Sequence, residues 1–137
     1  MTGIEREVLS TIQEMFEAVE EKDLDRLSAH YSQDNDLTAF LPTLPFRVDG
    51  YSQFWQGMED YQTKRTVSRV EMFQPKVQIY GDVAITTFYS TTRVYAPEAS
   101  MPQGESPSPR THTARTTYVL HKRNDKWVLV HTHVSAL

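Results

Sequence analysis

The chain has 137 residues, no cysteine, and a net charge of −4 from 14 basic and 18 acidic side chains. This length fits one domain with its own core. The lack of cysteine excludes disulfides and thiolate nucleophiles, and the acidic balance argues against nucleic-acid binding. No apolar run approaches the roughly 20 residues that cross a bilayer, and the acidic start lacks the basic region of a secretion signal. We therefore expect one cytoplasmic domain over residues 1–137, without nucleic-acid or membrane partners.

The first half of the chain has helical periodicity. Apolar residues recur there at steps of three and four, with polar residues between them. Thr2 and Glu5 have the spacing of a capping box, and Asp23 is a second potential cap. The pattern predicts helices over 3–22, 23–31 and 50–62, and a short strand over 37–41.

From residue 66 the period changes to two, which is typical of strands. Gly81-Asp82 and Asn124-Asp125 are tight-turn signals, and a proline-rich segment, 97–109, is expected to form a surface loop. The predicted strands cover 66–80, 83–96, 110–123 and 126–135. Helices followed by strands indicate an α+β fold, in which three helices pack on one strongly bent antiparallel sheet and enclose a pocket.

Two-residue turns predict the register of the strands. The last hairpin would pair Leu120 with Leu129, Tyr118 with His131 and Thr116 with His133, and the Gly81-Asp82 turn would pair Met72 with Thr91 and Val70 with Arg93. Pro75 makes the second register less secure, because it can introduce a bulge. The predicted concave face thus carries Tyr118, His131, His133, Thr91 and Arg93. The other face of the final hairpin is also apolar, which predicts self-association through the sheet.

Several short strings resemble a known superfamily. They are Lys22-Asp23-Leu24, Thr38-Ala39-Phe40 with Pro42, Val48-Asp49-Gly50 with Phe54-Trp55, Pro109-Arg110-Thr111, His121-Lys122-Arg123, Lys126-Trp127, and Val130-His131-Thr132-His133 with Ser135. In this order they resemble the nuclear transport factor 2-like superfamily, which includes ketosteroid isomerase-like and SnoaL-like proteins. The C-terminal strings are most similar to the association (hub) domain of calcium/calmodulin-dependent protein kinase II. The resemblance implies a cone-shaped fold and a homodimer or higher homo-oligomer.

The hub resemblance also implies a pocket in which cations hold carboxylates. The corresponding positions fall near Ser68, Thr91 and Tyr118, so the basic residues are missing there, and Arg93 is the nearest replacement. The chain has no kinase motifs and no basic amphipathic helix, so we expect neither kinase activity nor calmodulin binding.

Isomerase chemistry is disfavoured by the residues at the family's catalytic positions. The stretch that would supply the base, 38–41, has no acid, and Phe16 and Val119 stand where the resemblance implies the two oxyanion donors. We therefore assign no catalytic residue with this chemistry. If the chain is an enzyme, His131 and His133 are the candidates for acid–base work.

Each candidate residue has more than one interpretation. His131 and His133 point the same way on a strand and suit a metal, a polar network or catalysis, but no third metal ligand shares their predicted face. Arg93 is a clamp for a ligand carboxylate or a member of an internal ion pair. Trp55, Tyr89, Thr91 and Tyr118 complete the predicted ligand-binding set.

Three functions follow from these observations. The first is a self-associating protein that binds a small polar or carboxylate-bearing molecule in its cone, without a metal or cofactor. The second is a SnoaL-like enzyme that performs acid–base chemistry, of isomerase, cyclase or hydratase type, on a small organic substrate. The third is a purely structural oligomerisation module. Fold analogy alone does not separate them, because this superfamily hosts many functions.

Overall fold

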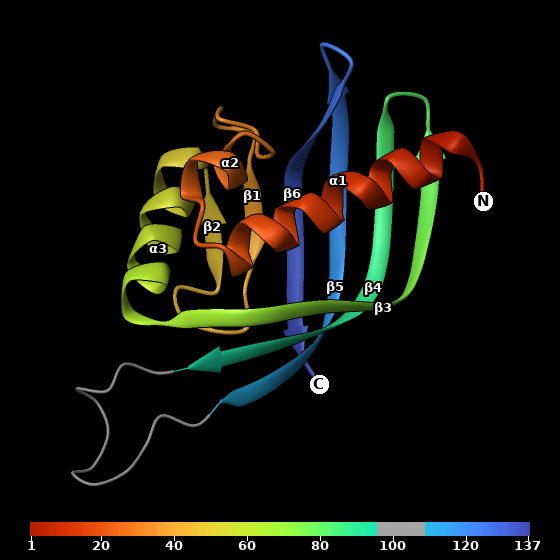
Figure 1. Ribbon diagram of the computed structural model, residues 1–137. Coiled ribbons are helices and arrows are strands. Elements are labelled where there is room, and N and C mark those ends of the chain that lie inside the picture. Colours follow the sequence, from red (N-terminus) through yellow and green to blue (C-terminus); the bar gives the residue numbers. More distant parts are fainter. Residues whose placement is uncertain (96–108) are drawn as a thin grey trace, which may run out of the picture.

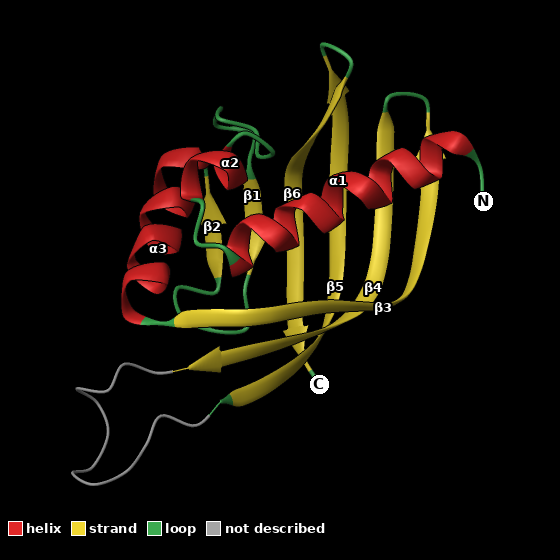
Figure 2. Cartoon of the chain, viewed as in Figure 1, coloured by secondary structure: helices red, strands yellow, loops and turns green. Residues whose placement is uncertain are grey.

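The computed structural model shows three helices on one face of a six-stranded sheet (Figures 1 and 2). It describes residues 1–95 and 109–137, so nearly all of the expected surface loop, 97–108, lies outside the described residues. The elements are α1 (Gly3–Glu20), α2 (Leu24–Ser28), β1 (Thr38–Phe40), β2 (Arg47–Asp49), α3 (Tyr51–Lys64), β3 (Thr66–Tyr80), β4 (Val83–Tyr95), β5 (Arg110–Arg123) and β6 (Lys126–Ala136). The strand order is β2-β1-β6-β5-β4-β3. The α+β prediction is confirmed, although β1 runs parallel to β6, so the sheet is mixed.

The first two helices begin at the predicted caps. The Thr2 hydroxyl accepts a hydrogen bond from the Glu5 amide at 3.2 Å, and the Asp23 carboxylate accepts one from the Arg26 amide at 3.1 Å. The second helix is shorter than predicted and ends at Ser28. The chain then joins the sheet, because the amide of Ser32 and the carbonyl of His30 both hydrogen-bond to Leu129 of β6.

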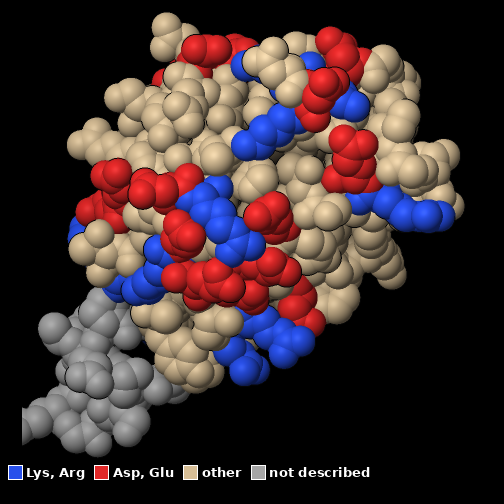
Figure 3. All heavy atoms as spheres, turned by 45° about the horizontal axis from the view of Figure 1, so that its top comes forward, with Lys and Arg blue, Asp and Glu red and all other residues tan. Residues whose placement is uncertain are grey.

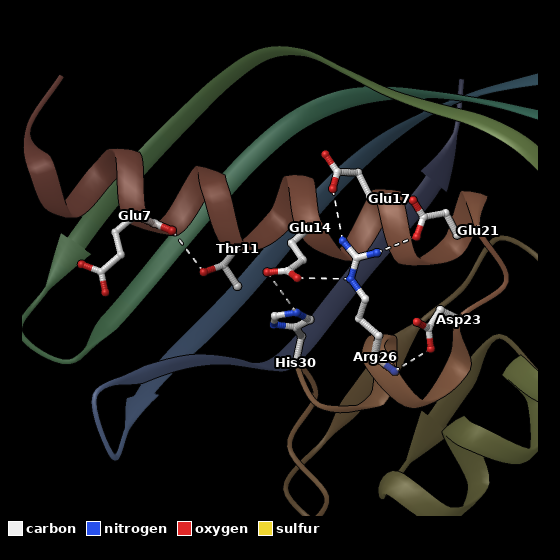
Figure 4. A network of polar contacts seen from close by, with 8 residues as sticks. All are labelled: Glu7, Thr11, Glu14, Glu17, Glu21, Asp23, Arg26 and His30. Atoms are coloured by element: carbon white, nitrogen blue, oxygen red, sulfur yellow. Dashed lines mark hydrogen bonds and ion pairs between the residues drawn. The ribbon is translucent and has the colours of Figure 1, made fainter.

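An arginine links the first two helices. Arg26 of α2 contacts Glu14, Glu17 and Glu21 of α1 at 3.2, 3.2 and 2.7 Å, and His30 approaches Glu14 at 3.7 Å (Figure 4). These glutamates raise the pKa of Arg26, the Glu14 hydrogen bond having the largest effect. The contacts connect α2 to α1 at the molecular surface. Figure 3 shows acidic and basic side chains interspersed over the face in view.

The core lies between the helices and the inner face of the sheet, which we define as the face under the helices. Alternate residues of β4 and β5, such as Ala84, Phe88 and Leu120, are buried there with apolar residues of α1. The opposite side of the sheet is the outer face. The buried residues of α1 are Val8, Ile12, Met15, Phe16 and Ala18.

The register of the last hairpin differs from the prediction. Leu120 pairs with Leu129 as expected, but a β-bulge follows, so Tyr118 pairs with Thr132 and Val119 with His131. The predicted pairs of Tyr118 with His131 and of Thr116 with His133 are wrong. One extra residue in β6, Val130, moves every following side chain to the other face. The two histidines therefore lie on the outer face, opposite Tyr118.

The register of β3 and β4 also differs by one residue. Glu71 pairs with Thr91 and Arg69 with Arg93, where Met72 and Val70 were expected. Shifts occur between Phe73 and Lys76, around Pro75, and between Val67 and Arg69. Pro75 cannot donate to the ladder, which accounts for a bulge at that place. Consequently Thr91 and Arg93 also face outward, away from the helices.

The short strand β2 was not predicted. Its three residues pair with β1, and only Val48 is buried. Three residues are too few to reveal a period of two. No helix of the described ranges has the length and hydropathy needed to cross a bilayer.

Packing on the inner face predicts a stability difference between two leucines. Leu120 is completely buried, whereas Leu44 is 80% exposed in the loop between β1 and β2. We expect Leu120→Ala to lower the free energy of unfolding by about 2–5 kcal/mol because it removes contacts and leaves a cavity. The matched change Leu44→Ala should alter it by less than about 0.5 kcal/mol. Urea unfolding followed by circular dichroism measures both, and equal losses would contradict the assignment of the inner face.

Candidate functional site

The outer face carries four exposed aromatic side chains. Phe40 of β1 is 40% exposed, Phe73 of β3 and Tyr89 of β4 are each 44% exposed, and Tyr80 at the end of β3 is 59% exposed. Phe73 lies directly opposite Tyr89, which puts their side chains on the same face as cross-strand neighbours. Ile85 and Val119, also paired, add apolar surface near the centre of the sheet. No described element covers this face in Figure 1.

The two histidines lie at the β1 end of this face. His131 Nδ1 is 2.7 Å from the Thr38 hydroxyl, and the Phe40 ring is 5.9 Å from the His131 ring and 5.4 Å from the His133 ring. The Arg47 guanidinium is 5.3 Å from the centre of the same phenylalanine ring. Burial, followed by electrostatic repulsion from His133 and Arg47, lowers the pKa of His131, and a hydrogen bond with the Thr38 backbone offsets part of this shift. The neutral form of His131 is therefore favoured at pH 7.

Two hollows formed by described residues involve the outer face. The larger, about 350 Å³, is open and shallow, and it is lined by Tyr89, Arg115, Thr117, His133 and Ser135 among others. The smaller, about 90 Å³, is lined by Arg69, Glu71, Thr91, Arg93 and Thr111. The predicted ligand-binding residues are thus divided: Tyr89 and His133 border one hollow, and Thr91 and Arg93 border the other.

Tyr118 has different surroundings on the inner face. It pairs with Thr86 on one side and Thr132 on the other, and its ring packs edge-on against Phe88 at 5.2 Å. Burial raises the pKa of Tyr118 to about 12. Burial, with Tyr118 as a smaller cause, raises the pKa of Tyr31 well above its usual value. Both phenols stay protonated and can donate hydrogen bonds.

Two hydroxyl groups beside Tyr118 are unpartnered. The side-chain oxygens of Thr86 and Thr132 are buried without a hydrogen-bond partner among the described residues. Such groups are costly unless water or a ligand satisfies them. Sequence reasoning missed these two threonines, because threonine is common in strands and only the observed register places them on either side of the half-buried Tyr118.

Trp55 belongs to an aromatic cluster on α3. Its ring stacks on Tyr51 at 5.7 Å and lies 5.9 Å from Tyr31, which in turn contacts Phe54 at 5.1 Å. The structure therefore joins Trp55 to the helical side of the core, away from Arg93 and the histidines. Within residues 1–95 and 109–137, no three histidine, cysteine or carboxylate side chains are grouped to hold a metal ion.

The sequence model of the SnoaL-like domain matches residues 8–137. This chain belongs to the SnoaL-like domain family. The resemblance inferred from its motifs is thereby confirmed at the family level. A search of the curated proteins found no match for this SnoaL-like chain.

Solved structures of the same fold come from several organisms. An NTF2-like protein of unknown function from Pseudomonas putida KT2440 is 21% identical and has a TM-score of 0.76. The alignment covers 100% of this chain and 89% of the Pseudomonas chain. A candidate dehydratase of the NTF2-like family from Streptomyces avermitilis is 17% identical, with coverages of 96% and 95% and a TM-score of 0.75. The kinase II hub homology domain of Chlamydomonas reinhardtii is 24% identical, with coverages of 99% and 99% and a TM-score of 0.73. These similarities establish the fold.

The lowered pKa of His131 predicts that stability depends on pH. The unfolded chain binds more protons than the folded chain as the pH falls below about 6.5, so the His131 contribution is present above that pH and is lost below it. We expect the urea concentration at the unfolding midpoint to decrease as the pH is lowered from about 7.5 to about 5.5. His131→Gln should reduce this fall.

His30 provides the matched comparison. Its pKa is also lowered, chiefly by burial and secondly by Lys126, so part of the pH dependence should persist in His131→Gln and disappear when His30→Gln is added. The same pH profile in the wild type and in His131→Gln would contradict the description of the His131 environment.

Proposed function

We propose that this SnoaL-like domain is a self-association module in which two copies pair through the outer face of the sheet. The main observation in favour of this proposal is the exposure of Phe40, Phe73 and Tyr89 on a regular sheet surface that no described element covers. Aromatic residues are enriched at protein interfaces, where burial removes their large apolar area from water. A second copy presents the same complementary surface, as a two-fold interface requires.

The dimensions of the sheet support this proposal. Four strands of about ten residues present roughly 600 Å² in projection, and the relief of their side chains increases the accessible area. A standard interface buries about 800 Å² on each partner. The printed name of the Chlamydomonas relative, a hub homology domain, is consistent with self-association as a role for this fold.

Tyr89→Asp tests the proposed interface. A carboxylate placed at the centre of two paired faces loses its hydration and lies close to the same carboxylate of the second copy. The Kd of the assembly should therefore rise at least tenfold. Multi-angle light scattering should give a multimer for the wild type and the mass of one chain for Tyr89→Asp at the same concentration.

Ile4→Asp is the control for that experiment. Ile4 is 47% exposed, close to the 44% of Tyr89, but it lies on α1 and not on the sheet. It should leave the assembled mass unchanged. A monomeric wild type, or equal dissociation in both variants, would contradict an interface on the outer face.

A second candidate function is binding of a small polar molecule under the helices. The specific observation in its favour is the pair of unpartnered threonine oxygens beside Tyr118. A carbonyl or carboxylate oxygen there would accept hydrogen bonds from Thr86, Thr132 and the Tyr118 phenol. Acid–base chemistry that combines Tyr118 with His131 is not supported, because the two side chains lie on opposite faces.

Native mass spectrometry of freshly purified protein tests this second function. The wild type should carry a reproducible extra mass. Tyr118→Phe removes one hydrogen-bond donor and should lower the fraction of protein that carries this mass by about tenfold. His131→Gln is the control, because it lies on the other face and should retain the mass. A ligand-free wild type, or loss of the mass in His131→Gln alone, would contradict binding at the inner face.

A further inference from the structure

The loop between β1 and β2, residues 41–46, presents apolar side chains to solvent. Leu44 is 80% exposed and Phe46 is 53% exposed, and none of the six residues is charged. Two backbone hydrogen bonds of 2.8 Å close the loop on itself, from the Leu41 amide to the Phe46 carbonyl and from the Phe46 amide to the Thr43 carbonyl. We call residues 41–46 the apolar loop. Large apolar side chains exposed together on an ordered segment indicate an interaction surface.

The apolar loop lies beside the larger hollow of the outer face. Phe40, the last residue of β1, pairs with His133 of β6, and their rings are 5.4 Å apart. His133 lines the hollow of about 350 Å³. The loop follows Phe40 directly, so loop and hollow are neighbours at the C-terminal end of β6 (Figure 2). The loop does not fill this hollow in its own chain, because Leu44 remains largely exposed.

We propose that the apolar loop of each copy docks into the larger outer-face hollow of a second copy. This inference rests on the proposed self-association and specifies the contact that holds the two copies. Because loop and hollow are neighbours on one surface, a two-fold axis between them lays each loop over the hollow of the other copy. The same contact is then made twice, as an isologous interface requires.

The hollow has room for the two exposed side chains of the loop. A water molecule occupies about 30 Å³ in the liquid, so a hollow of about 350 Å³ holds roughly a dozen such volumes. A side-chain carbon with its hydrogens is of similar size. The side chains of Leu44 and Phe46, with four and seven carbon atoms, therefore fit together in the hollow.

The area of the loop complements that of the sheet. The four strands present roughly 600 Å² in projection, whereas a standard interface buries about 800 Å² on each copy. A fully buried phenylalanine removes about 150–250 Å² from water, and about half of Phe46 is exposed, so its burial adds roughly 100 Å². Leu44, with its larger exposed fraction, adds a comparable area. The apolar loop therefore supplies the area that the strands alone lack.

The side chains around the hollow suit an apolar segment. Tyr89 offers an exposed ring, and the guanidinium of Arg115 can lie flat on the Phe46 ring while its donors remain in water at the rim. The same type of contact occurs within the chain, where Arg47 lies 5.3 Å from the centre of the Phe40 ring. Because the apolar loop carries no charge, its burial does not require desolvation of an ion.

A lipid surface suits the apolar loop less well than a second copy does. Segments that lie on membranes combine apolar side chains with an excess of basic ones. Arg47, the residue that follows the loop, is balanced by Asp49 at 3.2 Å. The chain carries a net charge of −4, which opposes attraction to anionic lipids.

Cross-linking of two single-cysteine variants tests the docking directly, because the chain has no cysteine of its own. Leu44→Cys labels the loop, and Thr117→Cys labels the lining of the hollow. An equilibrated mixture of ¹⁵N-labelled Leu44→Cys and unlabelled Thr117→Cys is treated with a short bismaleimide. The main product should join the two variants and is identified by its mass. Ile4→Cys, at an exposed apolar position on α1, replaces Leu44→Cys in the control and should give no such product.

Leu44→Asp measures how much the loop contributes to assembly. The exposure of Leu44 in its own chain means that this change should preserve the circular dichroism spectrum and the urea midpoint of the dissociated chain. The Kd of the assembly, measured by light scattering over a dilution series, should rise at least tenfold, because the new carboxylate would enter a hollow from which water is excluded.

The outcomes separate the docking from self-association itself. If the wild type assembles but only Thr117→Cys cross-links to itself, or if Leu44→Asp keeps the wild-type Kd, the docking is overturned and association through the outer face stands. A monomeric wild type overturns both. Equal mixed products from Ile4→Cys would indicate random collision and overturn the docking. Sedimentation of the wild type, but not of Leu44→Asp, with phosphatidylcholine–phosphatidylglycerol vesicles would assign the loop to a lipid surface instead.

Discussion

Side-chain alternation around the bulges in β6 and β3 determines what each face of this sheet can do. A strand repeats every two residues, so one inserted residue transfers every later side chain to the opposite face. In β6 the insertion at Val130 turns His131 and His133 outward and leaves Thr132 inward beside Tyr118. In β3 the irregularity around Pro75 lies between the Gly81-Asp82 turn and the pair of Arg69 with Arg93, and it shifts this pair by one residue from the predicted register.

These shifts separate two environments with different chemistry. Inside, α1 and the sheet enclose apolar side chains together with a protonated Tyr118 and two unpartnered threonine hydroxyls. Outside, exposed aromatic side chains and a neutral His131 share one surface. Burial of such aromatic side chains against a second copy favours association.

Much of the fold could be predicted from the sequence, because it depends on local signals. The caps at Thr2 and Asp23, the change from a helical period to a period of two, and the turns at Gly81-Asp82 and Asn124-Asp125 all correspond to observed features. Strand β2 escaped prediction because its three residues are stabilised by pairing with β1 and by burial of Val48. The short second helix has a similar cause, since the chain after Ser28 hydrogen-bonds to β6.

The candidate site was less predictable, because it depends on register and not on composition. Tyr118, His131 and Arg93 were all recognised as chemically distinctive residues, yet their grouping on one concave face assumed unbroken ladders. A bulge has only a weak sequence signal: Pro75 gave a warning in β3, whereas Val130 gave none in β6. The unpartnered oxygens of Thr86 and Thr132 are likewise visible only after three strands are aligned.

The division of the sheet into two faces, of which the outer one associates, can be tested directly with thiol labelling, because the chain has no cysteine of its own. Thr116 and Thr117 are neighbours on β5 that point to the inner and outer face, respectively. In dilute solution, Thr117→Cys should react rapidly with a maleimide and Thr116→Cys slowly. At high protein concentration, Thr117→Cys should become protected while Thr116→Cys does not change. The reverse order of reactivity would contradict the bulged register, and labelling of Thr117→Cys that is independent of concentration would contradict association through the outer face.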